Sequence, residues 1–189
     1  YERSMLNHLA KHPKDYAGAF RRLPIKLCKL FVQAYQSFLF NRFLSQRIRR
    51  GIPPNTAQIG DYVTELESHG LPTASSTQVT AQSLRSVQKA INENRICVAI
   101  PLIGFKQHLS SGMQGEIERE TLETENLTPK DFNVSSMPQI SAPGGLRTIL
   151  TSIISLSLGE LSEDPVNPPC QVLELGFMLH RGSYATVLL

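Results

Sequence analysis

The stretch LCKLFVQAYQSFLFNRFL, residues 27–44, with its continuation to Gly51, decides the fold of this chain. From Pro24 onward apolar side chains recur every third or fourth position, which predicts one long amphipathic helix. We expect its buried stripe to consist of Leu27, Phe31, Tyr35, Leu39 and Phe43. The opposite side carries Lys26, Lys29, Gln33 and Gln36. Gly51, followed by two prolines, ends the helix. This combination predicts a core helix that also offers a binding surface.

The composition is that of an ordinary soluble globular protein. The chain has 189 residues, 41% of them hydrophobic, which is enough for one domain or two small ones. No apolar run approaches the roughly 18 residues of a membrane span, and no signal-peptide pattern is present. The three widely separated cysteines, Cys28, Cys97 and Cys170, are typical of reduced and mostly buried thiols. We therefore expect a cytoplasmic protein without a membrane partner.

The charge of the chain is strongly segregated. Residues 1–50 hold 11 basic and two acidic side chains, a net charge of +9, and the remaining residues hold eight and 14, a net charge of −6. A basic segment of this kind is typical of a surface that faces a polyanion, most often a nucleic acid. Alternatively, the basic face docks on an acidic partner domain. Charge alone does not separate the two readings.

The rest of the sequence predicts an α+β fold. Short helices precede the long one, around residues 5–9 and after Pro13. Beyond Gly51 we expect a strand at 60–66, a loop at 68–77, a helix at 80–94, a buried strand at 96–104 and an acidic helix at 115–126. Residues 146–158 and 170–179 read as strands, joined by a loop at 160–169. Ser183 is placed to cap a helix that starts at Tyr184.

The residue types that bind metals do not converge in this sequence. His8 and His12 are one helical turn apart, but a proline follows and no third ligand is apparent. The acids of the 115–126 segment alternate around a helix, so neither a metal cluster nor an acid/base pair is expected. None of the cysteines has a recognisable base beside it. We expect no metal site.

Three separated motifs follow one another along the chain. They are AYQSFLFN at 34–41, GMQGEIERE at 112–120 and GSYAT at 182–186, supported by Asp15-Tyr16 with Gly18-Ala19-Phe20 and by Gly60-Asp61. Together, in this order, they resemble the TruD family of RNA pseudouridine synthases in its archaeal form. The agreement of several separated motifs over almost the whole chain makes the resemblance specific.

The resemblance implies an enzyme that isomerises a uridine in tRNA, in the D-arm region at position 13. Such an enzyme breaks the glycosidic bond and rejoins uracil through carbon, without cofactor or metal. The family's essential aspartate lies in a Gly-x-Lys-Asp-x-x-Ala motif, which this chain lacks. Lys14-Asp15 and Lys130-Asp131 each follow a proline and lack the glycine, so we read both as helix starts. We expect these 189 residues to be inactive on their own.

Two residues are candidates for the catalytic site. The resemblance places Tyr184 against the target base, and a base taken out of its stack needs such an aromatic surface. The structural alternative is an ordinary core or boundary tyrosine. Arg147 matches a basic family position and can hold the catalytic carboxylate ionised or grip a phosphate. Alternatively, Arg147 is a solvated residue after a loop.

Seven residues are candidates for RNA binding through backbone contacts and hydrogen bonds: Arg21, Arg22, Lys26, Lys29, Gln33, Gln36 and Arg181. Arg47, Arg49 and Arg50 are better explained by the negative end of the long helix, which their charges complement.

The predicted organisation is a fragment of an enzyme in three parts. Residues 1–51 form helices packed on the catalytic domain, residues 52–145 form the insertion domain of the family, and residues 146–189 return to the catalytic sheet. Both ends read as cut from a longer protein. Two other hypotheses remain: a noncatalytic RNA-binding or assembly module of the same architecture, and a helical protein-interaction domain. The sequence leaves the oligomeric state open.

Overall fold

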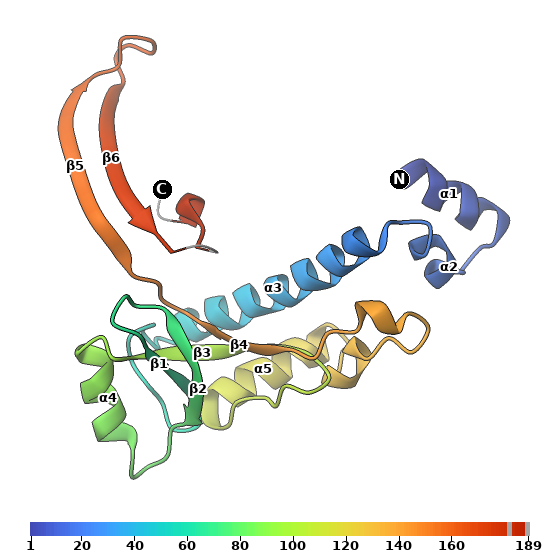
Figure 1. Cartoon of the computed structure of the whole chain (residues 1–189), viewed down its shortest axis with the longest axis horizontal. Helices are drawn as coiled ribbons and strands as arrows, with labels where there is room; N and C mark the ends of the chain where they lie inside the picture. The colour runs from blue at the N-terminus through green and yellow to red at the C-terminus, as the bar shows by residue number, and fades with distance from the viewer. Residues whose placement is uncertain (181–182, 188–189) are drawn as a thin grey trace.

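A computed structural model of the chain describes residues 1–180 and 183–187 (Figure 1). Three helices come first: α1 (Glu2–Lys11), α2 (Tyr16–Phe20) and α3 (Ile25–Arg49). A mixed region follows, with β1 (Tyr62–Leu66), β2 (Pro72–Gln78), α4 (Leu84–Asn92), β3 (Ile96–Leu102), α5 (Gly112–Thr124), η1 (Pro129–Phe132), η2 (Pro138–Ile140) and β4 (Gly145–Thr148). The last elements are β5 (Ile153–Glu163), β6 (Gln171–Leu179) and the short η3 (Ala185–Val187). The α+β prediction is confirmed.

Helix α3 spans 25 residues and is the longest element described. It begins directly after Pro24, whose carbonyl accepts hydrogen bonds from the amides of Leu27 and Cys28. At its other end Gly51 adopts a positive φ of 76°, its amide bonds to the Ile48 carbonyl, and the Ile52 amide bonds to the Arg47 carbonyl. These two bonds form a Schellman motif, for which glycine is the favoured residue. The predicted start and stop of the helix are therefore confirmed.

The four-stranded antiparallel sheet has the order β2-β1-β3-β4. Its helix-covered face meets α3 and α5 through a cluster that contains Leu39, Phe43, Ile100 and Ile117. The same face meets α4 through a second cluster, with Val63, Val87, Ile91 and Val98. Because side chains alternate along a strand, Cys97 and Ala99 point to the other face. These two clusters thus lie between one face of the sheet and three helices. A third cluster packs the N-terminal half of α3 against η2 and its surroundings, through Leu23, Cys28, Met137 and Ile140.

Strands β5 and β6 form a separate two-stranded antiparallel ribbon that projects away from the four-stranded sheet (Figure 1). Many of its large apolar side chains are exposed, namely Leu156, Leu158, Leu161, Val172, Leu173, Leu175 and Met178. Helices α1 and α2 lie beyond the N-terminal end of α3, and α1 contributes no buried residue. An isolated hairpin is marginally stable in water, so the ribbon is an element suited to further packing.

Several sequence expectations were wrong in detail. The segment expected to be a loop at 68–77 contains β2, whose seven residues lack apolar alternation and become a strand by pairing with β1. Strand β5 continues to Glu163, inside the expected loop at 160–169. The acidic helix begins at Gly112 rather than Gly115, and Tyr184 precedes a short 3-10 turn rather than a helix.

The stripe of α3 is buried only in its second half. Leu39 and Phe43 are fully buried, but Phe31 is 50% exposed and Tyr35 is 37% exposed. The reason is that the sheet and α5 cover the C-terminal half of the helix, while the N-terminal half extends past them (Figure 1). The prediction of one continuous buried stripe is therefore wrong for this chain.

Candidate functional site

The basic residues around the start of α3 are exposed. Lys26, Lys29 and Gln33 lie on one side of the helix at i, i+3 and i+7. Arg21 donates a hydrogen bond of 2.8 Å to the Ser136 carbonyl, and Arg22 lies 3.3 Å from Nδ1 of His8. These five side chains form what we call the basic end of α3. Their exposure and charge suit contacts with a polyanion.

Gln36 does not belong to this surface. Its side chain is buried, and its amide nitrogen donates a 2.5 Å hydrogen bond to the Ile103 carbonyl at the end of β3. The sequence placed Gln36 on the polar side of the helix, but the sheet covers that side in the second half of α3. Gln36 joins the helix to the sheet, and its predicted contact with RNA is incompatible with this position.

Arg147 lies on β4 and turns toward α3. It donates a 3.3 Å hydrogen bond to Oγ of Ser37, and its guanidinium lies 5.1 Å from the ring centre of Phe40. A cation over an aromatic face is stabilised by the ring quadrupole. The side chain is half-buried rather than solvated, so the alternative of a free surface arginine does not describe it.

Tyr184 is 68% exposed near the base of the ribbon. Its neighbour Ser183 has its hydroxyl 3.1 Å from that of Thr151, and its amide donates to the His180 carbonyl. The backbone is therefore held while the ring remains open to solvent. No interaction joins Tyr184 to Arg147 within residues 1–180 and 183–187. Arg181 lies outside the described residues.

The two aspartates that follow Pro-Lys are helix starts, as predicted. Asp15 caps α2 by accepting from the Gly18 amide, and a hydrogen bond from His8 is the main reason that its pKa is lowered. Asp131 forms a capping box with Thr128, whose amide lowers the pKa of the carboxyl. Both carboxylates thus serve local structure.

A buried polar network, which the sequence did not predict, fixes the end of α3. Arg47 is fully buried and makes a bidentate pair with Asp61, at 2.8 and 2.7 Å. Its Nη1 also donates to Gln114 of α5, which in turn donates to Glu118. Burial raises the pKa of Glu118, although hydrogen bonds from Gln114 and Ser110 oppose this. The expectation that Arg47 only complements the helix dipole was wrong, because its partners lie 14 and 67 residues away.

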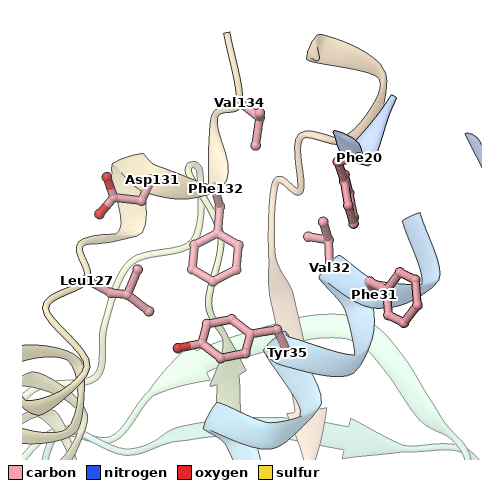
Figure 2. A pocket seen from close by; sticks show the side chains of 8 residues that line it. All are labelled: Phe20, Phe31, Val32, Tyr35, Leu127, Asp131, Phe132 and Val134. Atoms are coloured by element: carbon pink, nitrogen blue, oxygen red, sulfur yellow. The ribbon is translucent and has the colours of Figure 1, made fainter. Parts of the chain in front are cut away.

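An apolar cavity of about 260 Å³ lies beside the first half of α3. Figure 2 shows side chains of α3 on one side, facing Phe132 and Leu127, while the carboxylate of Asp131 points away. The lining consists of Phe20, Phe31, Val32, Tyr35, Leu127, Asp131, Phe132 and Val134. Such a lining suits apolar packing rather than the binding of a charged group.

Two features are absent from the part of the chain that the structure describes. None of its helices is long and apolar enough to cross a membrane. No group of three or more His, Cys, Asp or Glu side chains gathers there in a way that could hold a metal ion.

Comparison with known proteins identifies a family. The sequence pattern of tRNA pseudouridine synthase D (TruD) matches residues 1–189. The chain belongs to the TruD family. Relatives named tRNA pseudouridine synthase D occur in Methanococcoides burtonii, 40% identical over the whole chain, and in Methanopyrus kandleri, 41% identical over the whole chain. A crystal structure of the TruD protein from Methanosarcina mazei superposes on 98% of the chain with a TM-score of 0.85 and 37% identity.

The chain spans less than half the length of these TruD relatives: 43% of the M. burtonii protein, 38% of the M. kandleri protein and 42% of the M. mazei chain. Two of the TruD-like motifs meet in the buried network, since Asp61 and Gln114 both bond to Arg47. In this chain these motifs join α3, β1 and α5. They mark a structural junction rather than a reacting group.

Proposed function

We propose that this chain is part of a tRNA pseudouridine synthase, which converts a uridine of the tRNA D-arm, at position 13, to pseudouridine. The observation that carries the proposal is the TruD match over residues 1–189, with relatives named as tRNA pseudouridine synthases. In the reaction the C1′–N1 bond breaks and a C1′–C5 bond forms. The C5 proton leaves and N1 gains a proton, so the product is an isomer.

The chain contributes binding and positioning in this proposal. The basic end of α3 contacts the tRNA backbone, and Tyr184 stacks on the displaced uracil. The nucleophilic aspartate comes from outside these residues, because the Gly-x-Lys-Asp-x-x-Ala motif is absent. Residues 1–51 pack on the catalytic domain, residues 52–145 form the insertion domain and residues 146–189 complete the catalytic domain.

The unpartnered surfaces support a place in a larger enzyme. Helix α3 carries a second apolar face, with Leu30, Phe31 and Phe38 exposed, opposite the face that meets the sheet. Exposed apolar patches of this kind usually mark surfaces that another part of a protein covers. More than half of the M. burtonii relative lies outside the part that matches this chain. We propose that the equivalent part of the full-length enzyme covers this face of α3 and the ribbon.

The test is tritium release from tRNA labelled at uridine C5. The 189-residue chain alone should remain at background, and the full-length product of its gene should release tritium at one uridine of the D-arm. Turnover by the chain alone would contradict the division of roles. A full-length product that binds tRNA without releasing tritium would instead support the second candidate, a noncatalytic RNA-binding module, for which absence of the aspartate motif from the full-length sequence would also speak.

A further inference from the structure

The four-stranded sheet has one face that the helices leave open. Strand register identifies the side chains on it: Thr64 stands opposite Ser76 and Cys97, and Ala99 stands opposite Thr148. Their neighbours Val63 and Val98 belong to the cluster that packs on α4. We call Thr64, Ser76, Ala99 and Thr148, with the cavity they line, the open face. Thr64 and Ala99 are buried at its floor, while Ser76 is exposed and Thr148 is half-buried.

The open face contains a cavity of about 450 Å³, within the range of about 300–1,000 Å³ that ligand sites occupy. Most of its lining is small or hydroxyl-bearing, and the lining contains no acidic side chain: Thr64, Pro72, Thr73, Ala74, Ser76, Ala99, Leu102, Gln107, Leu146, Arg147 and Thr148. Arg147 belongs to this lining because it lies on β4, but its guanidinium points to the helix-covered side of the sheet, where it donates to Ser37.

Some of these polar groups are engaged and others are available. The Thr64 hydroxyl donates to the carbonyls of Thr73 and Ser75, and Oγ1 of Thr73 accepts from the Ser75 amide. Within the described residues the hydroxyls of Ser76 and Thr148 have no hydrogen-bond partner in the protein. Ser76 also stands on β2, the outer strand of the sheet, whose free edge presents further backbone donors and acceptors.

The open face is connected with the surroundings of Tyr184. The turn between β1 and β2 reaches the base of the ribbon, where His180 donates through Nε2 to the His69 carbonyl at 2.5 Å. At the same base Thr151 meets Ser183, the residue before Tyr184. These two contacts place the turn that joins β1 and β2 beside the segment that carries Tyr184.

We propose that the open face binds the ribose–phosphate backbone of the tRNA segment that flanks the target uridine. This inference rests on the proposed function. Hydroxyl and amide groups are usual partners of phosphate oxygens and of the 2′-hydroxyl, and the absence of acids avoids repulsion. A protein partner is the less suitable occupant, because the cores of protein interfaces are enriched in aromatic residues and depleted in serine.

The test compares two adjacent exposed hydroxyl residues of β2 that point to opposite faces. Ser76→Glu puts a negative charge on the open face, and the matched control Thr77→Glu puts the same charge on the side of Val63. Binding of an unmodified tRNA transcript to the 189-residue chain is measured by anisotropy over a salt series. Ser76→Glu should weaken binding about tenfold and reduce the log–log salt slope by about one, whereas Thr77→Glu should change affinity less than twofold.

A second pair of variants tests the same inference if a glutamate disturbs folding. Ser76→Lys should raise the affinity for tRNA and steepen its log–log dependence on salt, and Thr77→Lys should change neither. Equal effects of the two positions would overturn the inference while leaving the proposed function intact, provided that the unmodified chain binds tRNA and the full-length product releases tritium. Failure of the unmodified chain to bind tRNA would overturn the inference, whereas tritium release by the full-length product decides the proposed function independently. An effect of Ser76→Glu on association with the rest of the enzyme, with tRNA affinity unchanged, would assign the open face to protein packing instead.

Discussion

Arg47 is the largest side chain that is fully buried among the described residues. A buried guanidinium is tolerated only when its charge is paired and its donors are satisfied, because removing it from water is expensive. Asp61 supplies two oxygens, and Gln114 and the Thr56 carbonyl supply further acceptors, so that both terminal nitrogens of Arg47 are bonded and, among the described residues, its Nε alone lacks a partner. The network therefore holds the end of α3 in one position relative to β1 and α5.

Removing the carboxylate from this network should be strongly destabilising. Asp61→Asn leaves the buried Arg47 without its counter-charge, and we expect a loss of about 3–5 kcal/mol in the free energy of unfolding. Arg50→Ala is the control, because Arg50 pairs with Glu120 at the surface and its loss should remove less than about 1 kcal/mol. Urea unfolding of both variants measures this. Similar losses of unfolding free energy in the two variants would show that burial does not make the Arg47–Asp61 pair more important for stability than the surface pair.

Glu118 should make stability depend on pH in a defined direction. Burial raises its pKa in the folded state above the ordinary value of 4.5, so the folded chain binds this proton more tightly than the unfolded chain does. The contribution is complete below the unfolded pKa and is lost as pH rises through the folded pKa. The difference in unfolding free energy between the wild type and Glu118→Gln should therefore fall as pH rises above about 4.5. A difference that does not change with pH would contradict the assignment.

Tyr184 should matter for turnover and little for folding. In the full-length product Tyr184→Ala removes the surface that stacks on the uracil, and base–aromatic stacking is worth about 1–3 kcal/mol. We expect kcat/KM for tritium release to fall at least about tenfold, with Tyr184→Phe retaining most of it. The melting temperature should barely change, since the ring is exposed in this chain. Equal activity of the alanine variant would reject the role.

At the scale of elements, α3 consists of two halves with different surroundings. Its C-terminal half is enclosed by the sheet and α5, and its N-terminal half carries the basic end together with an exposed apolar face. The apolar cavity beside Phe31 and Tyr35 lies along this N-terminal half. The same helix thus contributes to a finished core and to a surface that is still unpartnered.

Leucines in the two halves should respond differently to substitution. In the 189-residue chain Leu39→Ala should lower the free energy of unfolding by about 2–5 kcal/mol, because Leu39 is fully buried. Leu30→Ser should change it by no more than about 0.5 kcal/mol, because Leu30 is 56% exposed. In the full-length product the effect of Leu30→Ser should grow to more than about 1 kcal/mol if this face is covered there. The same small effect in both proteins would contradict that packing.

The sequence was informative where the deciding contacts are local. Pro24, Gly51 and the apolar spacing define α3, and the run from Ile96 defines β3. It failed where distant contacts decide. Strand β2 exists through its pairing with β1, Gln36 is buried because Ile103 lies over it, and the role of Arg47 depends on Asp61 and Gln114.

For the candidate site, the sequence identified the basic end of α3 and the two helix-capping aspartates, because charge patterns and caps are local signals. The open face could not be predicted in this way. Ser76 and Thr148 are 72 positions apart in sequence and share a face only through the strand order β2-β1-β3-β4.

At the scale of the whole molecule, the ribbon of β5 and β6 is the part of the described chain that exposes many large apolar side chains without packing partners. Exposed apolar strands offer both side chains and free backbone edges to other chains. In isolation, this chain should therefore associate with itself through β5 and β6, and the covering segment of a longer enzyme should prevent it.

A charge placed on the ribbon should reduce this association. Leu158→Lys interrupts the exposed apolar surface, and Ser162→Lys adds the same charge to the same strand without removing an apolar side chain. Sedimentation velocity of the isolated chain over a range of concentrations should show a larger shift toward monomer for Leu158→Lys. Equal shifts toward monomer in the two variants would show that the added charge, and not the loss of an exposed apolar side chain, reduces the association.

The distribution of ion pairs along α3 has a kinetic consequence. Arg42, Arg47 and Arg50 are paired with Glu125, Asp61 and Glu120, whereas Lys26 and Lys29 at the other end of the helix are exposed, with Arg21 and Arg22 beside them. At the C-terminal end the exposed Arg49 is the remaining arginine without an ion pair among the described residues. The helix is roughly 37 Å long, so it separates a strongly positive end from a largely neutralised one by several Debye lengths. An approaching polyanion therefore experiences a torque before any contact forms, and the molecule meets it with the start of α3 first.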